Sequence, residues 1–356
     1  MSVGPDAIRT RAIKVAKSTS LSLTAIGLAL LVSAVLILLA GFNPLIAYAA
    51  LLKGAFGDSF AIGNTLARTT PLIFTGLAVA FAFRCNLLNI GAEGQLYAGA
   101  LASVVVGIFV TGLPTPLHIM LAIAAGFAAG AMWGGLAGLM KSQRGINEIV
   151  STIMLNFVAI FFVSYMVQGP IAEPPGFFHQ TAQVATTARL PIIAPKSDLS
   201  IGILIAVGCA IFIAYLLWRT PFGLRLRTVG RSEGAARFAG IPVNRFMFGA
   251  MSISGGLAGL AGTVEIIGSQ YRLLDFFSPG YGFDGIAVAF LGRSDPIGVI
   301  FAAFLFAALR IGANQMQRTT GLPTSLVLVI QGTVILFILG AGILQWYRQR
   351  QQEKGA

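Results

Sequence analysis

Polar side chains that could act on a solute are concentrated in one short segment of this sequence. Asn86-Leu-Leu-Asn89-Ile-Gly-Ala-Glu93-Gly-Gln95 places amides and a carboxylate among glycines, directly before a long apolar run. Ionisable side chains and irregular backbone occur at membrane depth only where they are buried in protein or lie beside water. The segment therefore predicts a broken helix. Glu93 would either line a solute path or lock two helices together, and for Gln95 the lock is the favoured interpretation.

Further polar residues have the right type for such a lining. Asn156 lies two turns inside an apolar run that begins at Glu148, and an amide can hydrogen-bond a solute without the cost of a buried charge. Asp284 lies among glycines at the start of another apolar run, as Glu93 does. Glu148 itself is explained by the helix dipole, which stabilises an acid in the first turn. The predicted polar lining consists of Asn86, Asn89, Glu93, Asn156 and Asp284.

A few other charged residues fall inside or near the ends of apolar runs. Arg68 and Arg310 lie near predicted span ends, where a long basic side chain can snorkel to the lipid headgroups. Glu265 is a further acid within an apolar run. Snorkelling explains the two arginines adequately.

The sequence lacks the residue patterns of several kinds of enzyme. It contains no Gly-x-x-x-x-Gly-Lys-Ser/Thr phosphate-binding loop, so ATP hydrolysis is not expected in this chain. Cys85 and Cys209 have no metal-ligand spacing, and His179 is a lone histidine for which an ordinary loop role is favoured. No nucleophile is paired with a histidine. The chain is therefore predicted to be no enzyme, with no cofactor and no metal site.

The composition indicates which elements position these residues. Hydrophobic residues make up 56% of the chain and charged residues 10%, whereas soluble proteins carry about 25% charged residues. We predict a single all-α membrane domain over residues 1–356 with about ten membrane spans, of which the eighth and ninth are short, since a full span needs about 20 apolar residues. The spans are expected near 21–41, 60–83, 87–112, 117–140, 146–168, 200–218, 247–268, 281–294, 296–313 and 322–345. Segment 45–57 would form a partial or surface helix, and the first run is interpreted as a retained span rather than a signal peptide.

The basic residues predict the orientation in the membrane. A net charge of +12 could suggest nucleic acid, but most of the 24 lysines and arginines fall on one side of the predicted bundle. Cytoplasmic loops carry such an excess, so an even number of spans would place both termini in the cytoplasm. The proline-rich loop 169–199 would then lie outside. The basic residues on the inner side are Arg9, Arg11, Lys14, Lys17, Arg84, Lys141, Arg144, Arg219, Arg225, Arg227, Arg231, Arg237, Arg245, Arg293, Arg348, Arg350 and Lys354.

An internal repeat is visible in the order of these segments. The acid among glycines at Glu93 has a counterpart at Asp284, and the stretch from Gly145 is similar to the stretch from Gly321. Both pairs are separated by an odd number of predicted spans, which reverses the chain direction. The halves 60–168 and 247–345 are therefore predicted to be inverted-topology repeats, an architecture found in many transporters.

Glycines at a spacing of four mark two helices that pack closely. Gly126, Gly130 and Gly134 share one face of a predicted span, as Gly255 and Gly259 do on another. Small residues let helix backbones approach in a membrane, where van der Waals packing takes the place of the hydrophobic effect.

The cytoplasmic loop 219–246 carries the most specific pattern. Ser232 can cap a short helix through Ala239, which Gly240 and Pro242 would end. Arginines along the loop suit anionic headgroups, but a short capped helix also suits docking into a groove on a cytoplasmic partner.

At this loop the chain resembles the permease subunits of bacterial ABC importers, in the branch for simple sugars and nucleosides. The resemblance rests on the loop together with Asn89–Gln95, Asn147–Asn156 and Gly282–Gly292. Of these, Asn89–Gln95 and Asn147–Asn156 are most similar to purine-nucleoside permeases. It implies a multi-pass protein of the bacterial inner membrane that moves a nucleoside or simple sugar inward. It also implies three partners besides membrane lipids: a cytoplasmic ABC ATPase, a second permease subunit, homologous or identical, and a periplasmic or lipid-anchored solute-binding protein.

By the same resemblance, residues of the loop match the coupling helix that contacts the ATPase. These are Ser232, Glu233, Ala235, Ala236, Arg237, Ala239 and Gly240. The main alternative is a secondary transporter driven by an ion gradient, which buried acids and inverted repeats would also fit.

Overall fold

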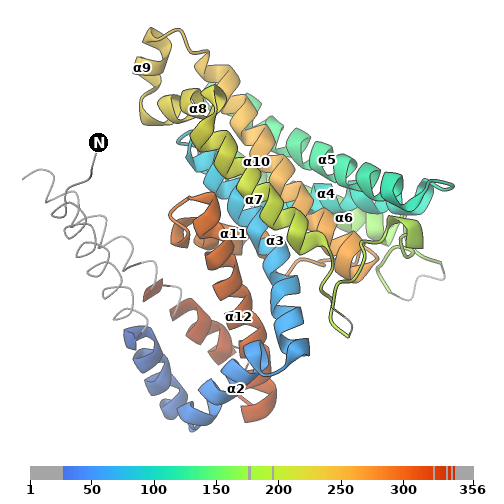
Figure 1. Ribbon diagram of the computed structural model, residues 1–356, viewed down its shortest axis with the longest axis vertical. Helices are drawn as coiled ribbons and strands as arrows, with labels where there is room; N and C mark the ends of the chain where they lie inside the picture. Colours follow the sequence, from blue (N-terminus) through green and yellow to red (C-terminus); the bar gives the residue numbers. More distant parts are fainter. Residues whose placement is uncertain are drawn as a thin grey trace, which may run out of the picture. The chain divides into compact units, whose positions relative to one another are not determined.

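The computed structural model describes residues 27–174, 178–194, 196–323, 325–333, 336–337 and 340 (Figure 1). Most of these residues are helical, and the isolated β-bridges among them join loop residues. The chain divides into two compact units, Asp58–Ala308 and Met1–Gly57 with Leu309–Ala356. Each unit is considered by itself.

The larger unit contains the helices that carry most of the candidate residues. They are α3 (Ser59–Phe83), α4 (Ala92–Phe109), α5 (Thr115–Arg144), α6 (Glu148–Gln168), the 3-10 turn η1 (Thr186–Ala188), α7 (Gly202–Arg219), α8 (Pro221–Arg231), α9 (Glu233–Phe238), α10 (Val243–Glu265), the π-helical turn η2 (Ile266–Gln270), α11 (Tyr281–Leu291) and the start of α12 (Pro296–Thr320).

The smaller unit holds a helix over Gly27–Leu39, α2 (Pro44–Phe56) and the end of α12. Its core contains Ile37, Ala47 and Met316, which are all buried. Asn43 begins α2 by accepting a hydrogen bond from the Leu45 N–H at 2.9 Å. The partial helix predicted at 45–57 is thus present as α2.

Seven of the described helices are long and apolar enough to cross a membrane. They correspond to the predicted spans that begin at residues 60, 87, 117, 146, 200, 247 and 296. The structure does not provide a complete span at 281–294, because α11 has 11 residues. At about 1.5 Å per residue it is about 16 Å long, against an apolar thickness of about 30 Å. The predicted spans 21–41 and 322–345 lie partly outside the described residues, so ten spans are not confirmed.

Helix α10 lies at the centre of the larger unit. It packs against α3, α4 and α5 (Figure 1), and most residues of its apolar stretch are buried. The predicted glycine packing is confirmed: an added Cβ at Gly259 would fall on the carbonyl of Gly126 and 3.0 Å from the Cα of Gly130. Since backbone meets backbone here, α5 and α10 can pack at close range, and both contact α4.

Candidate functional site

The predicted break between two helices is present between α3 and α4. Helix α3 ends at Phe83 and α4 begins at Ala92. Asn89 lies in the break and is fully buried. Its Nδ2 donates to Gln95 Oε1 at 2.8 Å and to Ser254 Oγ on α10 at 2.7 Å. Asn89 Oδ1 accepts from the Gly91 N–H at 2.9 Å. The amide therefore satisfies the interrupted backbone and ties it to α10.

Asn156 on α6 reaches the same break from the other side. Its Oδ1 accepts from the Gly94 N–H at 2.7 Å, and its Nδ2 donates to the Ile90 carbonyl at 2.9 Å. The residue is 1% exposed. Both ends of this amide thus pair with backbone groups that a continuous helix would have paired within itself.

Glu93 joins the start of α4 to the start of α11. Its Oε2 accepts a 2.6 Å hydrogen bond from the backbone N–H of Gly282, and the side chain is buried. Asp284 lies half-buried in the first turn of α11. The fold therefore brings Asn89, Glu93 and Asn156 together, with Asp284 on the helix that Glu93 contacts.

Asn86 is separate from this group. It is exposed and has a left-handed backbone, with φ of 58°, in the turn that ends α3. Its backbone lies beside Gly230 of α8. A residue in that position serves the turn, and the structure gives no support to its predicted role in a polar lining.

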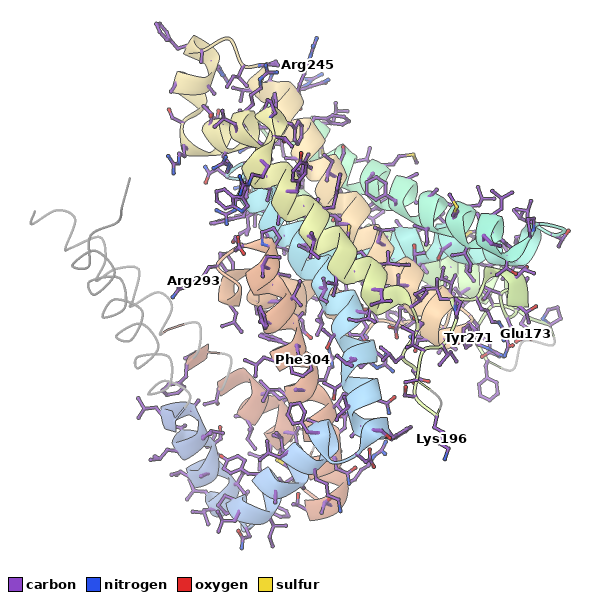
Figure 2. The ribbon with its side chains drawn as sticks, viewed as in Figure 1. Glu173, Lys196, Arg245, Tyr271, Arg293 and Phe304 are labelled. Carbon is purple, nitrogen blue, oxygen red and sulfur yellow. The ribbon has the colours of Figure 1, made fainter. Side chains whose placement is uncertain are left out.

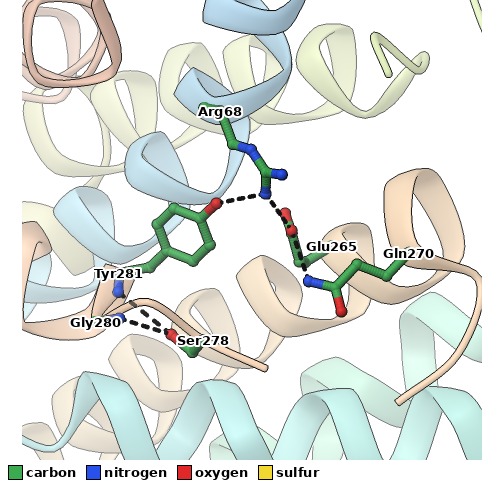
Figure 3. Close-up of polar contacts among 6 residues, drawn as sticks. All are labelled: Arg68, Glu265, Gln270, Ser278, Gly280 and Tyr281. Atoms are coloured by element: carbon green, nitrogen blue, oxygen red, sulfur yellow. Dashed lines mark hydrogen bonds and ion pairs between the residues drawn. The ribbon is translucent and has the colours of Figure 1, made fainter. Parts of the chain in front are cut away.

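A second cluster, centred on Arg68 of α3, was not expected from the sequence (Figure 3). Arg68 Nη1 donates to Glu265 Oε1 at 2.6 Å and to the Tyr281 hydroxyl at 2.8 Å, and Gln270 Nε2 donates to the same Glu265 oxygen at 2.9 Å. Glu265 is 2% exposed, whereas the Arg68 side chain is 32% exposed. The predicted snorkelling of Arg68 is therefore wrong, because its charge pairs inside the protein.

The Arg68 cluster lies where α10 passes into a π-helical turn and where α11 begins. Glu265 is the last residue of α10 before its π-helical turn, a feature often found at functional sites. Tyr281 is the first residue of α11, and Ser278 Oγ accepts from its N–H at 3.3 Å. The sequence shows Arg68 and Glu265 as separate charged residues in apolar runs. Whether their side chains meet depends on how α3 and α10 cross.

The loop 219–246 contains the predicted capped helix. Ser232 Oγ accepts from the Ala235 N–H at 3.2 Å at the start of α9, and Gly240 takes a left-handed backbone just after its end. Ala236 is fully buried, whereas Phe238 is 97% exposed. Figure 1 shows α8 and α9 at one end of the larger unit, next to the end of α7 and the start of α10. The exposed Phe238 was missed from the sequence, although an aromatic residue beside a capped helix could have signalled it.

Comparisons with known proteins identify the family. Residues 61–339 match the family described as "Branched-chain amino acid transport system / permease component". The chain belongs to this permease family. It is similar to the guanosine ABC transporter permease protein NupP of Bacillus subtilis, with 36% identity over 338 residues that cover 94% of this chain and 97% of the relative.

Other relatives of this permease are named for different solutes. The nucleoside ABC transporter permease protein NupB of Lactococcus lactis is 34% identical over 330 residues, covering 89% of both chains. The glucose ABC transporter permease protein TsgB13 of Haloferax volcanii is 34% identical over 330 residues, covering 90% of this chain and 87% of the relative. The permease is therefore a multi-pass membrane protein and a transport component.

The end of the larger unit away from α8 and α9 is formed by loop 169–199 and the segment after α10. Figure 2 places Arg245 at one end of the larger unit, and Glu173, Tyr271 and Lys196 toward the other. There, Arg272 pairs with Glu173 at 3.3 Å, and Arg189 lies over the Tyr271 ring at 4.7 Å. These contacts attach the described part of loop 169–199 to the segment after α10.

Proposed function

We propose that this permease imports a nucleoside, or alternatively a simple sugar, driven by ATP hydrolysis in a separate cytoplasmic subunit. The observation that carries this proposal is the α8–α9 segment. Its second helix, α9, is short and capped, and carries the almost fully exposed Phe238. The exposed Arg231 and Arg237 lie close to it in the chain. An exposed aromatic side chain on a rigid helix is a typical anchor for a partner groove.

The charge of the α8–α9 end supports the proposed orientation. The α8–α9 end carries Arg225, Arg231 and Arg237, and cytoplasmic segments carry such an excess. The opposite end, with loop 169–199, would face a periplasmic or lipid-anchored solute-binding protein. We place the chain in the inner membrane as one permease domain with both termini in the cytoplasm, paired with a second permease subunit.

The order of elements supports two inverted repeats. Each half contains a long helix (α3 or α10), a non-helical stretch, and a helix with an acid in its first turn (α4 or α11). Each continues with a long helix that ends at a left-handed glycine, Gly145 after α5 and Gly321 after α12. The shortness of α11 means that it would reach only part-way through the bilayer.

We propose that the buried amides hold the broken helix and that the solute passes beside α11. Asn89 and Asn156 use both ends of their amides in hydrogen bonds to the protein. Asp284 is half-buried on α11. Gln270 Oε1 is buried without a hydrogen-bond partner among the described residues, so the Arg68 cluster keeps an acceptor for a polar solute. Asn86 is left out of this path.

Transport in sealed vesicles tests the proposal. The permease would be reconstituted with its ATPase and second permease, and uptake of labelled guanosine and glucose would be measured with and without ATP. We expect uptake only with ATP and the ATPase. Uptake by the permease alone that stops when the proton gradient collapses would instead establish an ion-driven transporter and overturn the ATP-driven one.

A further inference from the structure

One aromatic ring near the α8–α9 segment contacts two arginines. The guanidinium carbon of Arg227, on α8, is 4.5 Å from the centre of the Trp218 ring, and that of Arg84 is 5.0 Å from it. Trp218 lies at the end of α7, directly before α8. Arginine stacks on aromatic faces through both charge and planarity. The ring therefore connects α8 to Arg84, the residue that follows α3.

Arg84 also holds the turn between α11 and α12. Its Nε and Nη2 donate to the Ser294 carbonyl at 3.0 and 2.7 Å, and Nη2 lies 3.5 Å from the Arg293 carbonyl. Arg293 and Ser294 both have positive φ, 56° and 51°, which is strained for residues with side chains. A turn of this kind needs partners for its carbonyls, and Arg84 provides them.

The backbone of Arg84 contacts α8 directly. A Cβ added at Gly230 of α8 would fall on the Arg84 carbonyl, so the two backbones touch. Gly230 is separated from the cap of α9, Ser232, by one residue. Phe83 packs its ring edge-on against Phe290 of α11 at 5.5 Å. Contacts therefore run without a gap from α8, through Arg84 and its neighbour, to the end of α11.

The chemistry of Arg84 suits a rigid connection. Burial lowers the pKa of its guanidinium from the ordinary value, Asp295 raises it and Arg227 lowers it. Arginine nevertheless keeps its proton in proteins, so the side chain remains a charged, planar donor. A lysine would keep the charge, but it could not donate from two nitrogens while stacking on the ring.

We infer that Arg84 is the positioning residue that transmits movement of α8–α9 to α11. The inference rests on the proposed function, in which α8–α9 contacts the ATPase. Displacing α8 shifts Arg84 through Gly230 and Trp218, and Arg84 pulls on the 293–294 turn. Because α11 is short, that pull reaches Tyr281 and Gly282 at its other end, where the Arg68 cluster and Glu93 hold it.

Transport per ATP hydrolysed by the full complex tests this role. For Arg84→Gln we expect uptake to fall by about tenfold, in the usual range of coupling effects, with ATPase activity and assembly retained. Arg84→Lys should be intermediate. Trp218→Phe should keep most coupling, and Trp218→Leu should lose it. Arg144→Gln, which changes an exposed arginine at the end of α5, is the control.

Three results would overturn the inference. One is an unchanged uptake-to-ATPase ratio in Arg84→Gln. Another is a parallel loss of uptake, assembly and thermal stability, which would mean that Arg84 only stabilises the turn. The last is measured on the unaltered complex: amide hydrogen exchange at residues 290–296 is the same with and without nucleotide. A complex without any ATP-dependent uptake would instead contradict the proposed function.

Discussion

Glu93 Oε2 accepts a 2.6 Å hydrogen bond from the backbone N–H of Gly282, 189 residues further along the chain. One carboxylate thereby serves the first turns of both α4 and α11. The N-cap residues of these helices, Gly91 and Gly280, provide no side-chain cap. A negative charge is favourable at each helix N-terminus. A Cβ at Gly282 would fall on the Glu93 backbone, so only glycine allows the two helix ends to meet.

Removing the Glu93 carboxylate should destabilise this junction. Glu93→Leu leaves the Gly282 N–H without that acceptor, at a cost of about 1–3 kcal/mol. Glu93→Gln keeps an acceptor but loses the charge, and we expect about half that cost, because charge-assisted hydrogen bonds are about twice as strong as neutral ones. Thermal unfolding of the purified permease in lipid nanodiscs measures both. Equal stability of Glu93→Leu and the unaltered chain would contradict the assigned contact.

Replacing only one partner of the Arg68–Glu265 ion pair should lower the free energy of unfolding strongly. In Arg68→Leu, Glu265 remains buried without its arginine, which should cost about 3–5 kcal/mol. The double variant Arg68→Leu/Glu265→Leu should lose less than the sum of the two single changes, because no unpaired charge is left. The double-mutant cycle, read from unfolding midpoints, gives the coupling energy.

An exposed pair offers the control for that cycle. Arg237 and Glu233 lie 3.7 Å apart with side chains 64% and 49% exposed, and such pairs contribute about 0–1 kcal/mol. Arg237→Gln should therefore leave the stability almost unchanged. Additive effects of the Arg68 and Glu265 changes would show that the two groups do not interact.

The contact between α5 and α10 should not accept a side chain. Gly259→Ala places a methyl group on the Gly126 carbonyl, and such overpacking typically costs about 1–3 kcal/mol. Gly249→Ala on the same helix has nothing within 4 Å and should be neutral or slightly stabilising. Yield and unfolding temperature of the two variants, compared side by side, measure the difference. Indistinguishable variants would mean that the helices lie further apart.

Phe238 should contribute to partner binding and not to folding. It is 97% exposed, so Phe238→Asp should leave the unfolding temperature unchanged. Affinity for the ATPase should fall by tenfold or more, corresponding to about 1.4 kcal/mol or above. Phe178→Asp, at a residue 74% exposed in loop 169–199, is the control and should bind normally. Normal binding of Phe238→Asp would remove this anchor from the interface.

Local sequence was sufficient for the elements that depend on neighbouring residues. The apolar runs predicted the seven long helices, because backbone polar groups in lipid must be satisfied within a helix. Ser232 and Gly240 marked the ends of α9 by cap chemistry. Gly126 and Gly259 marked close packing, since the four-residue spacing keeps small residues on one face. The motifs of the loop and the broken helix also indicated the permease family.

Only the tertiary structure decided which distant groups meet. Arg68 looked like a snorkelling residue because nothing in α3 alone shows that Glu265 lies at the same depth. Asn86 and Asn89 are close in sequence, yet one is exposed in a turn and the other is buried against Ser254. The apolar run at 281–294 was already short for a span, but only the structure shows that its helix stops after 11 residues. Which side chains of different helices meet depends on how the helices cross and on how far along each helix the residues lie. Composition and spacing along the sequence do not give either of these.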